Sequence, residues 1–148
     1  MRFLLDTNIC IYFLNQRSET VIQRLRQIPP QDVWLCSIVK AELWYGALKS
    51  ERPVQNCARL QEFFQGFLAM PFDDEAAEKY GEIRVALEQA GTPIGPNDLC
   101  IAAIALANKL VLITHNRQEF QYVEGLLLED WGLEKEMKPA PENMEGKG

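Results

Sequence analysis

The chain has 148 residues, of which 47% are hydrophobic, and its formal net charge at pH 7 is −6. This length suits one domain with a buried core, and the composition is ordinary for a globular protein. No apolar run approaches the roughly 20 residues that a membrane-spanning helix needs. The N-terminus runs directly into a strand-like segment and shows no signal peptide. We therefore expect a cytoplasmic protein without a membrane partner.

The net charge neither supports nor excludes a nucleic-acid partner. From Glu129 onward the chain has six acidic and three basic residues, so the part before it carries a net charge of only −3. The four cysteines show no CxxC pairing and no zinc-ligand spacing. We predict that all four cysteines are reduced and structural.

Short apolar segments typical of strands alternate with helical patterns along the chain. The strand-like segments are residues 3–5, 33–36, 68–72, 110–114 and 126–128. Helices are predicted at residues 9–14, 21–28, 37–48, 54–67, 74–90, 98–108 and 119–123. Ser37 and Asp73 are the expected N-caps of two of these helices.

This alternation predicts an α/β fold, with a mostly parallel sheet that has helices on both faces. Residues 1–131 are expected to form this domain. The charged tail over residues 132–148 is rich in proline and glycine, and we expect it to be disordered. Four aromatic residues near the polar strand ends are assigned to the core rather than to base stacking: Tyr12, Trp34, Trp44 and Tyr45.

Polar residues follow the ends of three predicted strands. Asp6 comes directly after the first strand, Glu42 lies about one turn into the helix after the second, and Asn116 lies just past the fourth. Asp98 lies in the first turn of a helix, where an ionised carboxylate is favoured. Ligands of parallel α/β sheets bind beyond the carboxyl ends of the strands. We therefore expect these four residues to converge on one crevice.

Each of these residues also has a simpler interpretation when it is taken alone. Asp6 and Asp98 can be helix caps, because aspartate caps helices well. Glu42 can be a solvated residue and Asn116 an ordinary turn residue. His115 is the only histidine of the chain, and an incidental turn position explains it without a function. The argument for a site therefore depends on the set of residues and not on any one of them.

Three converging carboxylates would repel one another unless a divalent cation lay between them. No lysine or arginine is adjacent in sequence to Asp6, Glu42 or Asp98. Oxygen ligands select a hard ion, Mg²⁺ or Mn²⁺, rather than zinc. Such an ion polarises a phosphoryl oxygen and lowers the pKa of an attacking water. The pattern therefore points to phosphodiester hydrolysis with these three residues as metal ligands.

Four motifs of the chain resemble the PIN-domain family, and within it the VapC-like toxins of bacterial toxin–antitoxin pairs. The motifs are Leu5-Asp6-Thr7-Asn8, Ala41-Glu42-Leu43 with Gly46, Ile94-Gly95-Pro96-Asn97-Asp98 with Ile101-Ala102-Ala103, and Leu112-Ile113-Thr114-His115-Asn116 with Glu119-Phe120. They occur in the order and spacing of the family from residue 3 to about residue 131.

The resemblance implies a three-layer α/β/α fold around a parallel sheet and Mg²⁺-dependent endoribonuclease activity. Proteins of this kind are often directed at initiator tRNA. A cognate antitoxin that occupies or disrupts the site, and assembly as a homodimer, are also implied.

Carried over by position, Asp6, Glu42 and Asp98 match the acidic metal ligands of the family. Asn116 falls where many PIN domains have a fourth aspartate, and this departure puts a second tightly held metal in doubt. Thr7 and Thr114 match small hydroxyl residues beside the acids, which are suited to orienting ligands.

Two alternatives to an RNA-cleaving toxin stay open. The acids alone do not choose between RNA and DNA, because contacts to the 2′-hydroxyl make that choice, so a structure-specific DNA nuclease of the same superfamily is one alternative. The other is a PIN-like binding module without catalysis. Dinucleotide, P-loop and aspartyl-phosphate folds lack their motifs here. Phosphate contacts are expected from four basic residues near the proposed site: Arg17, Lys40, Lys49 and Arg117.

Overall fold

The computed structural model describes residues 1–131, so the expected disorder of residues 132–148 lies outside the described residues. The strands are β1 (Phe3–Leu5), β2 (Val33–Cys36), β3 (Leu68–Met70), β4 (Val111–Ile113) and β5 (Leu128–Glu129). The helices are α1 (Thr7–Leu14), α2 (Glu19–Gln27), α3 (Ser37–Lys49), α4 (Pro53–Gln65), α5 (Asp74–Gln89), α6 (Pro96–Asn108) and α7 (Arg117–Phe120), with a short 3-10 helix at Pro30–Asp32.

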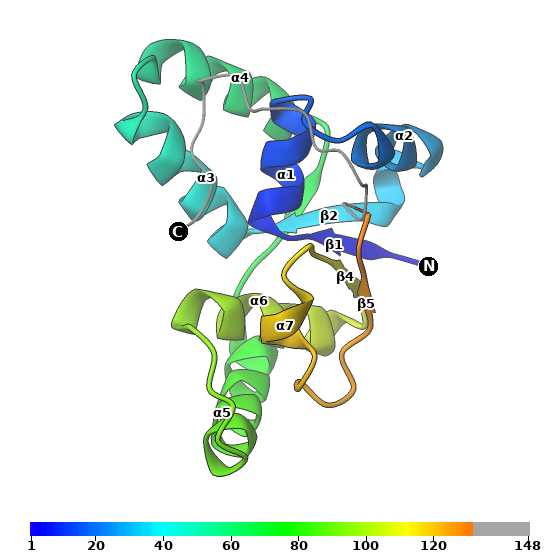
Figure 1. The fold of residues 1–148 in the computed structure, drawn as a ribbon, viewed down its shortest axis with the longest axis vertical. Coiled ribbons are helices and arrows are strands. Elements are labelled where there is room, and N and C mark those ends of the chain that lie inside the picture. The colour runs from blue at the N-terminus through cyan, green and yellow to red at the C-terminus, as the bar shows by residue number, and fades with distance from the viewer. Residues whose placement is uncertain (132–148) are drawn as a thin grey trace.

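The strands form one parallel sheet in the order β3-β2-β1-β4-β5. Phe3 of β1 lies opposite Val33 of β2 on one side and Val111 of β4 on the other. Because crossover connections between parallel strands are right-handed, the order places α1–α4 on one face and α5–α7 on the other. Figure 1 shows these two helical layers on opposite sides of the sheet. The predicted three-layer α/β/α fold is confirmed.

The core lies where the apolar strands meet the helices of both layers. Leu4, Leu5, Leu112 and Ile113 are fully buried, as expected for strands that are covered on both faces. Small buried residues of α6 let this helix pack closely against its neighbours: Ala102, Ala103 and Ala105. The two central strands therefore carry Asp6 and Thr114 on a rigid base.

Several predicted element boundaries differ from the structure by up to three residues, and three of these differences have a clear local form. Cys36, rather than Ser37, is the N-cap of α3. The last helix begins at Arg117 instead of residue 119, because Asn116 already turns the backbone into it. The last strand begins at Leu128 instead of residue 126, because a turn with a positive φ of 82° at Gly125 precedes it.

The core assignment of Tyr45 was also wrong, since this residue is 64% exposed. Helix α3 buries Leu43, Gly46 and Ala47, so Tyr45 lies on its outer side. The other three aromatic residues named above are half-buried. All four cysteines are free in the structure; Cys10 and Cys36 are buried.

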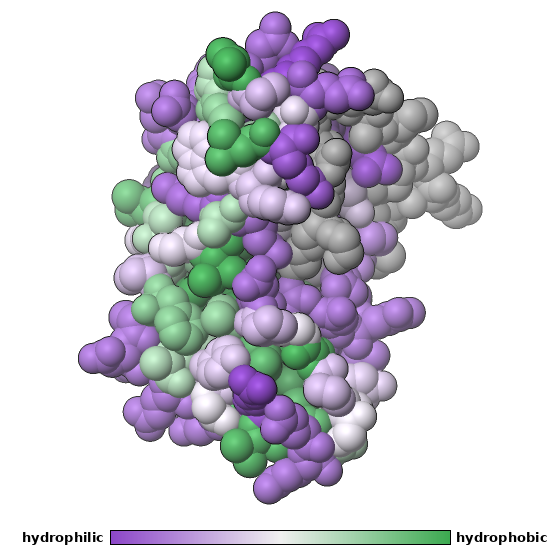
Figure 2. Space-filling model, turned by 90° about the vertical axis from the view of Figure 1, so that its left-hand side faces the viewer, coloured by the Kyte–Doolittle hydropathy of each residue, from purple (hydrophilic) through white to green (hydrophobic). Residues whose placement is uncertain are grey.

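Within residues 1–131, the exposed large hydrophobic side chains lie on several separate elements. The exposed large hydrophobic residues are Met1, Tyr45, Leu48, Val54, Leu68, Phe72, Val85, Tyr122 and Leu127. On the face that Figure 2 shows, hydrophobic patches are separated by hydrophilic ones. Every helix within residues 1–131 is too short or too polar to traverse a bilayer.

Candidate metal-binding active site

Asp6 lies where β1 ends and α1 begins, and its side chain is fully buried. The backbone N–H of Thr7 donates to Asp6 Oδ1 over 2.8 Å, which makes Asp6 the N-cap of α1. The hydroxyl of Thr114, at the end of β4, donates to Asp6 Oδ2 over 2.8 Å. The cap interpretation is therefore correct, and it is compatible with a ligand role because each carboxylate oxygen has a further lone pair.

Glu42 connects three elements at the same edge of the sheet. The hydroxyl of Thr7 in α1 donates to Glu42 Oε1 over 2.5 Å. The side-chain amide of Asn97 in α6 donates to Glu42 Oε2 over 3.4 Å. Glu42 lies on α3, one turn beyond the end of β2, so the structure brings α1, α3 and α6 together at its carboxylate.

Asp98 follows Asn97 in the first turn of α6, and only 6% of its surface is exposed. Helix α6 packs against α3, which places the segment with Asp98 beside the segment with Glu42. Its place in the first turn puts Asp98 at the positive end of the α6 helix dipole. The three acid-bearing segments that the sequence singles out therefore meet at the carboxyl edge of the sheet.

The pKa of the Cys36 thiol reports the same convergence. Burial raises this pKa from its ordinary value of 9.0 to about 11, although the backbone N–H groups of Val39 and Ile38 act in the opposite direction. The negative charges of Asp6 and Glu42 are smaller causes of the same rise. Because Cys36 ends β2, both carboxylates lie within electrostatic range of one strand end.

Asn116 is joined to this network through its backbone. Its N–H donates to the Thr114 hydroxyl over 2.9 Å, and that hydroxyl donates to Asp6. Within residues 1–131 the Asn116 side chain makes no capping hydrogen bond to α7. Thr114 thus links Asp6 to the start of α7.

His115 has a partner that sequence reasoning missed. His115 Nδ1 lies 3.2 Å and 3.0 Å from the two carboxylate oxygens of Asp130, just past β5. Its ring packs edge-on against Tyr12, with 6.0 Å between the ring centroids. Burial is the largest cause of the raised pKa of Tyr12; Arg17 opposes the shift, and the charges of Asp130 and Asp6 add to it. Asp130 directly follows a strand, as Asp6 does, and this position in the sequence was the signal that could have identified it as a site residue.

The expected phosphate-contacting residues lie on α3 (Lys40 and Lys49), on α7 (Arg117) and in the loop between α1 and α2 (Arg17). Arg17 Cζ lies 5.5 Å from the ring centroid of Tyr12, and Arg117 is exposed at the start of α7. The other two are also over aromatic rings: Lys40 Nζ is 4.7 Å from the centroid of Phe64 and Lys49 Nζ is 4.8 Å from that of Tyr45.

The donor set of this edge fits a hard divalent cation. Among residues 1–131, no three histidine, cysteine or acidic side chains form a ready metal-binding arrangement. The carboxylates of Asp6 and Glu42 are nevertheless oriented by hydrogen bonds from Thr7, Thr114 and Asn97. The three carboxylates, of Asp6, Glu42 and Asp98, offer only oxygen atoms as ligands, and Mg²⁺ and Mn²⁺ prefer oxygen ligands. A cation would have to draw the carboxylates closer together.

Comparison with known proteins gives the same family as the motifs. Residues 3–126 match the PIN domain. Ribonuclease VapC2 of Rickettsia felis is 39% identical over 132 residues, which cover 88% of this chain and 98% of that protein. The tRNA(fMet)-specific endonuclease VapC of Salmonella typhimurium is 37% identical over 131 residues, with the same shares of both chains.

Solved structures of related complexes have the same fold. The structure of DNA-bound VapBC from Salmonella typhimurium matches with a TM-score of 0.83 at 37% identity, over 88% of this chain and 98% of that one. VapBC2 from Rickettsia felis, bound to a promoter DNA fragment, also gives a TM-score of 0.83 at 37% identity, over 88% and 99% of the chains. The matched residues, the fold and the identities agree, and the chain belongs to the PIN-domain family.

Proposed function

We propose that the protein is a Mg²⁺-dependent endoribonuclease that acts as the toxin of a toxin–antitoxin pair. Asp6, Glu42 and Asp98 are the proposed metal ligands, and Mn²⁺ is a suitable substitute ion. One observation carries the proposal. Thr7 and Asn97 both donate to Glu42, and Thr114 donates to Asp6, so acid-bearing segments far apart in sequence meet at one edge of the sheet.

The residues of this edge prepare a site for hydrolysis of a phosphodiester. Thr7 fixes both acids at once, because its N–H donates to Asp6 and its hydroxyl donates to Glu42. Thr114 holds the second oxygen of Asp6 and so limits rotation of the buried carboxylate. When bound, the cation supplies the polarisation of a phosphoryl oxygen and lowers the pKa of a coordinated water. The proposed role of Asn116 is to hold water or substrate at the edge of this site.

Two residues of α3 support a single-stranded RNA substrate. Tyr45 is 64% exposed and lies three residues after Glu42, hence on the same side of the helix. The ammonium of Lys49 lies over its ring. An exposed aromatic ring beside a cation suits stacking of an unpaired base next to a phosphate. Of the related proteins, the VapC of Salmonella typhimurium is a tRNA(fMet)-specific endonuclease, and we infer a tRNA substrate here.

We further propose three properties that the relatives suggest. The related structures are VapBC complexes, so a cognate antitoxin is the expected protein partner. A groove between α1, α2 and α4 offers such a partner a mixed lining, in which Phe13, Ile22 and Phe63 lie beside the charged residues Arg26, Arg59 and Glu62. A homodimer is supported by exposed apolar residues of α3 and α4, Leu48 and Val54. The site of action is the cytoplasm, where tRNA is available.

The proposal is tested with purified protein that has been freed of antitoxin. Total tRNA and a matched DNA oligonucleotide are each incubated with Mg²⁺ or with EDTA, and Asp98→Asn is assayed in parallel. Asp74→Asn is the matched control, because Asp74 also lies in the first turn of a helix but is exposed. We expect discrete RNA fragments that require both Mg²⁺ and Asp98, with Asp74→Asn as active as the wild type.

Other outcomes would favour the alternatives. Cleavage of the DNA oligonucleotide at a similar rate would make the protein a DNA or general nuclease of the same superfamily. If folded protein cleaved neither nucleic acid, the proposal of a catalytic toxin would be rejected, and the protein would be a PIN-like binding module.

A further inference from the structure

The ring of His115 is held by a buried carboxylate. Only 2% of the Asp130 side chain is exposed, against 41% of the His115 side chain. The two carboxylate oxygens of Asp130 lie 3.2 Å and 3.0 Å from His115 Nδ1. An ionised carboxylate only accepts hydrogen bonds, so Nδ1 carries the proton of this bond. Nε2, on the opposite side of the ring, is therefore directed away from Asp130.

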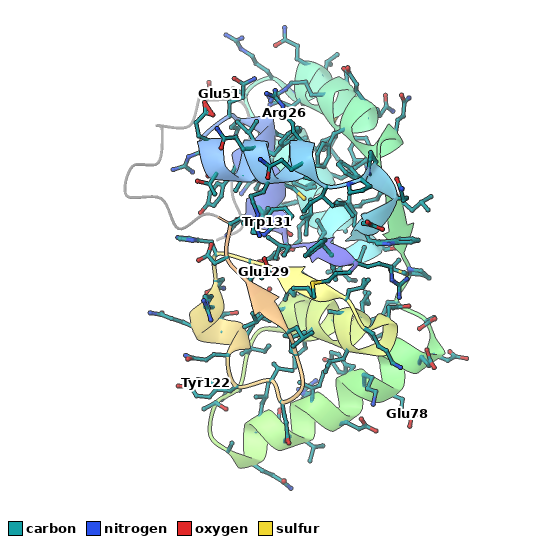
Figure 3. All side chains as sticks on the ribbon, turned by 90° about the vertical axis from the view of Figure 1, so that its right-hand side faces the viewer. Arg26, Glu51, Glu78, Tyr122, Glu129 and Trp131 are labelled. Carbon is teal, nitrogen blue, oxygen red and sulfur yellow. The ribbon has the colours of Figure 1, made fainter. Side chains whose placement is uncertain are left out.

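Asp130 is fixed because both of its neighbours are anchored. Arg24 of α2 donates to Glu129 Oε1 over 2.8 Å, and the indole N–H of Trp131 donates to the same oxygen over 3.2 Å. Trp131 is only 2% exposed, and its ring lies 5.6 Å from that of Phe3 and 5.3 Å from Arg24 Cζ. Figure 3 shows Glu129 and Trp131 at the end of β5, on the side of α2. The backbone that carries Asp130 has little freedom.

The His115 ring lies at the edge of the proposed metal site. His115 follows Thr114, whose hydroxyl donates to Asp6. Tyr12 packs against the His115 ring, and the charges of Asp6 and Asp130 both act on its hydroxyl group. The guanidinium of Arg17 also lies over the ring of Tyr12, with its Cζ 5.5 Å from the ring centroid. A cationic donor in this position offsets the repulsion between the carboxylates and an approaching phosphate.

We propose that His115 binds a backbone phosphate of the RNA next to the cleaved bond and that Asp130 is its positioning residue. In this complex the ring donates Nδ1–H to Asp130 and Nε2–H to the phosphate, and hydrogen bonds to these two anions are charge-assisted and strong. This inference rests on the ribonuclease function proposed above.

Binding of tRNA without catalysis tests the contact directly. The dissociation constant for bulk tRNA is measured in EDTA at several salt concentrations, for wild type, His115→Ala and Asp130→Asn. Arg84→Ala and Glu88→Gln are matched controls, because these residues form an exposed pair over 3.1 Å on α5. We expect His115→Ala to weaken binding about tenfold and to lower the slope of log Kd against log salt by about 0.7. Asp130→Asn should act in the same direction and add little to His115→Ala in the double variant.

Two further measurements separate a phosphate contact from a structural tie between β4 and β5. His115→Lys keeps a cationic donor, so we expect it to bind tRNA within about threefold of the wild type, whereas His115→Gln, which keeps only a neutral donor toward Asp130, should bind as weakly as His115→Ala. A matched DNA oligonucleotide should lose affinity for His115→Ala by the same factor as RNA. If His115→Ala lost affinity for RNA but not for DNA, the contact would be to the 2′-hydroxyl and not to a phosphate, and the proposal would be overturned.

Kinetics in Mg²⁺ separates this inference from the proposed function. His115→Ala should raise KM about tenfold and change kcat less, while the variants of the Arg84–Glu88 pair stay like the wild type. If wild-type protein cleaves tRNA but His115→Ala has unchanged KM, Kd and salt slope, the inference is wrong and the function stands. If wild-type protein cleaves no RNA, the proposed function itself fails.

Discussion

Replacing Asp6 by asparagine separates chemistry from folding in this protein. Asparagine caps helices as well as aspartate does, so its carbonyl oxygen can still accept the N–H of Thr7. Its NH₂ group meets the hydroxyl of Thr114 and can only donate to it, so the hydroxyl proton of Thr114 loses its acceptor. Loss of this bond to a carboxylate costs about 1 kcal/mol, and removal of a buried charge near Glu42 offsets part of this cost. For a chain of 148 residues, 1 kcal/mol shifts Tm by about 2–4 °C.

The effect on cleavage should be far larger than the effect on stability. Changes to residues that merely support metal ligands already lower metal affinity or activity about 10–100-fold, so loss of a proposed ligand should lower cleavage of tRNA at least about 100-fold. Thermal unfolding and tRNA cleavage are measured on the same preparations. Asp73→Asn is the matched control, because Asp73 caps α5 by accepting the N–H of Ala76 over 3.0 Å. Wild-type cleavage by Asp6→Asn, or a fall in Tm beyond about 10 °C, would refute this reasoning.

Three further substitutions test other parts of the account. Thr114→Val removes the hydroxyl that donates to Asp6 and should raise the Mg²⁺ concentration needed for half-maximal cleavage about 10–100-fold. Thr114→Ser keeps the hydroxyl and should need the same Mg²⁺ concentration as the wild type. Tyr45→Ala should raise KM for tRNA about tenfold, and Tyr45→Phe should not, because stacking needs only the ring; equal effects of both changes would contradict the stacking role. The pKa of Cys36 is raised to about 11, so its contribution to stability is complete below pH 9.0 and is lost as the pH rises towards 11. In urea titrations over this range, wild type should lose about 3 kcal/mol more free energy of unfolding than Cys36→Ala; parallel losses would show that this thiol stays unshifted.

The sheet could be predicted because its central strands have a simple pattern. Residues 3–5 and 110–114 are continuous apolar runs, and only a strand covered on both faces needs such a run. The polar residues that follow the predicted strands could then be placed at one edge, because parallel strands present their carboxyl ends together. Asp6 and Glu42 were singled out on this ground, and the structure connects both through Thr7.

The contacts around the acids could not be predicted, because they join residues far apart in the chain. The bond between Asn97 and Glu42 depends on how α6 packs against α3. The pair of His115 and Asp130 depends on where β5 begins, and a turn at residue 125 moves that start by two residues relative to the sequence pattern. Exposure of Tyr45 likewise follows from which side of α3 faces the core. Apolar periodicity determines the layers, whereas side-chain pairing depends on their final packing.

The most direct test of the central claim is a titration with Mn²⁺, followed by electron paramagnetic resonance of the free ion. The account predicts that wild-type protein binds Mn²⁺ and that Mg²⁺ competes for the same site. Asp6→Asn, Glu42→Gln and Asp98→Asn should each weaken binding at least about tenfold, while the exposed control Asp74→Asn should not. Equal Mn²⁺ affinity in all four variants and the wild type would contradict the claim that these three carboxylates hold the metal.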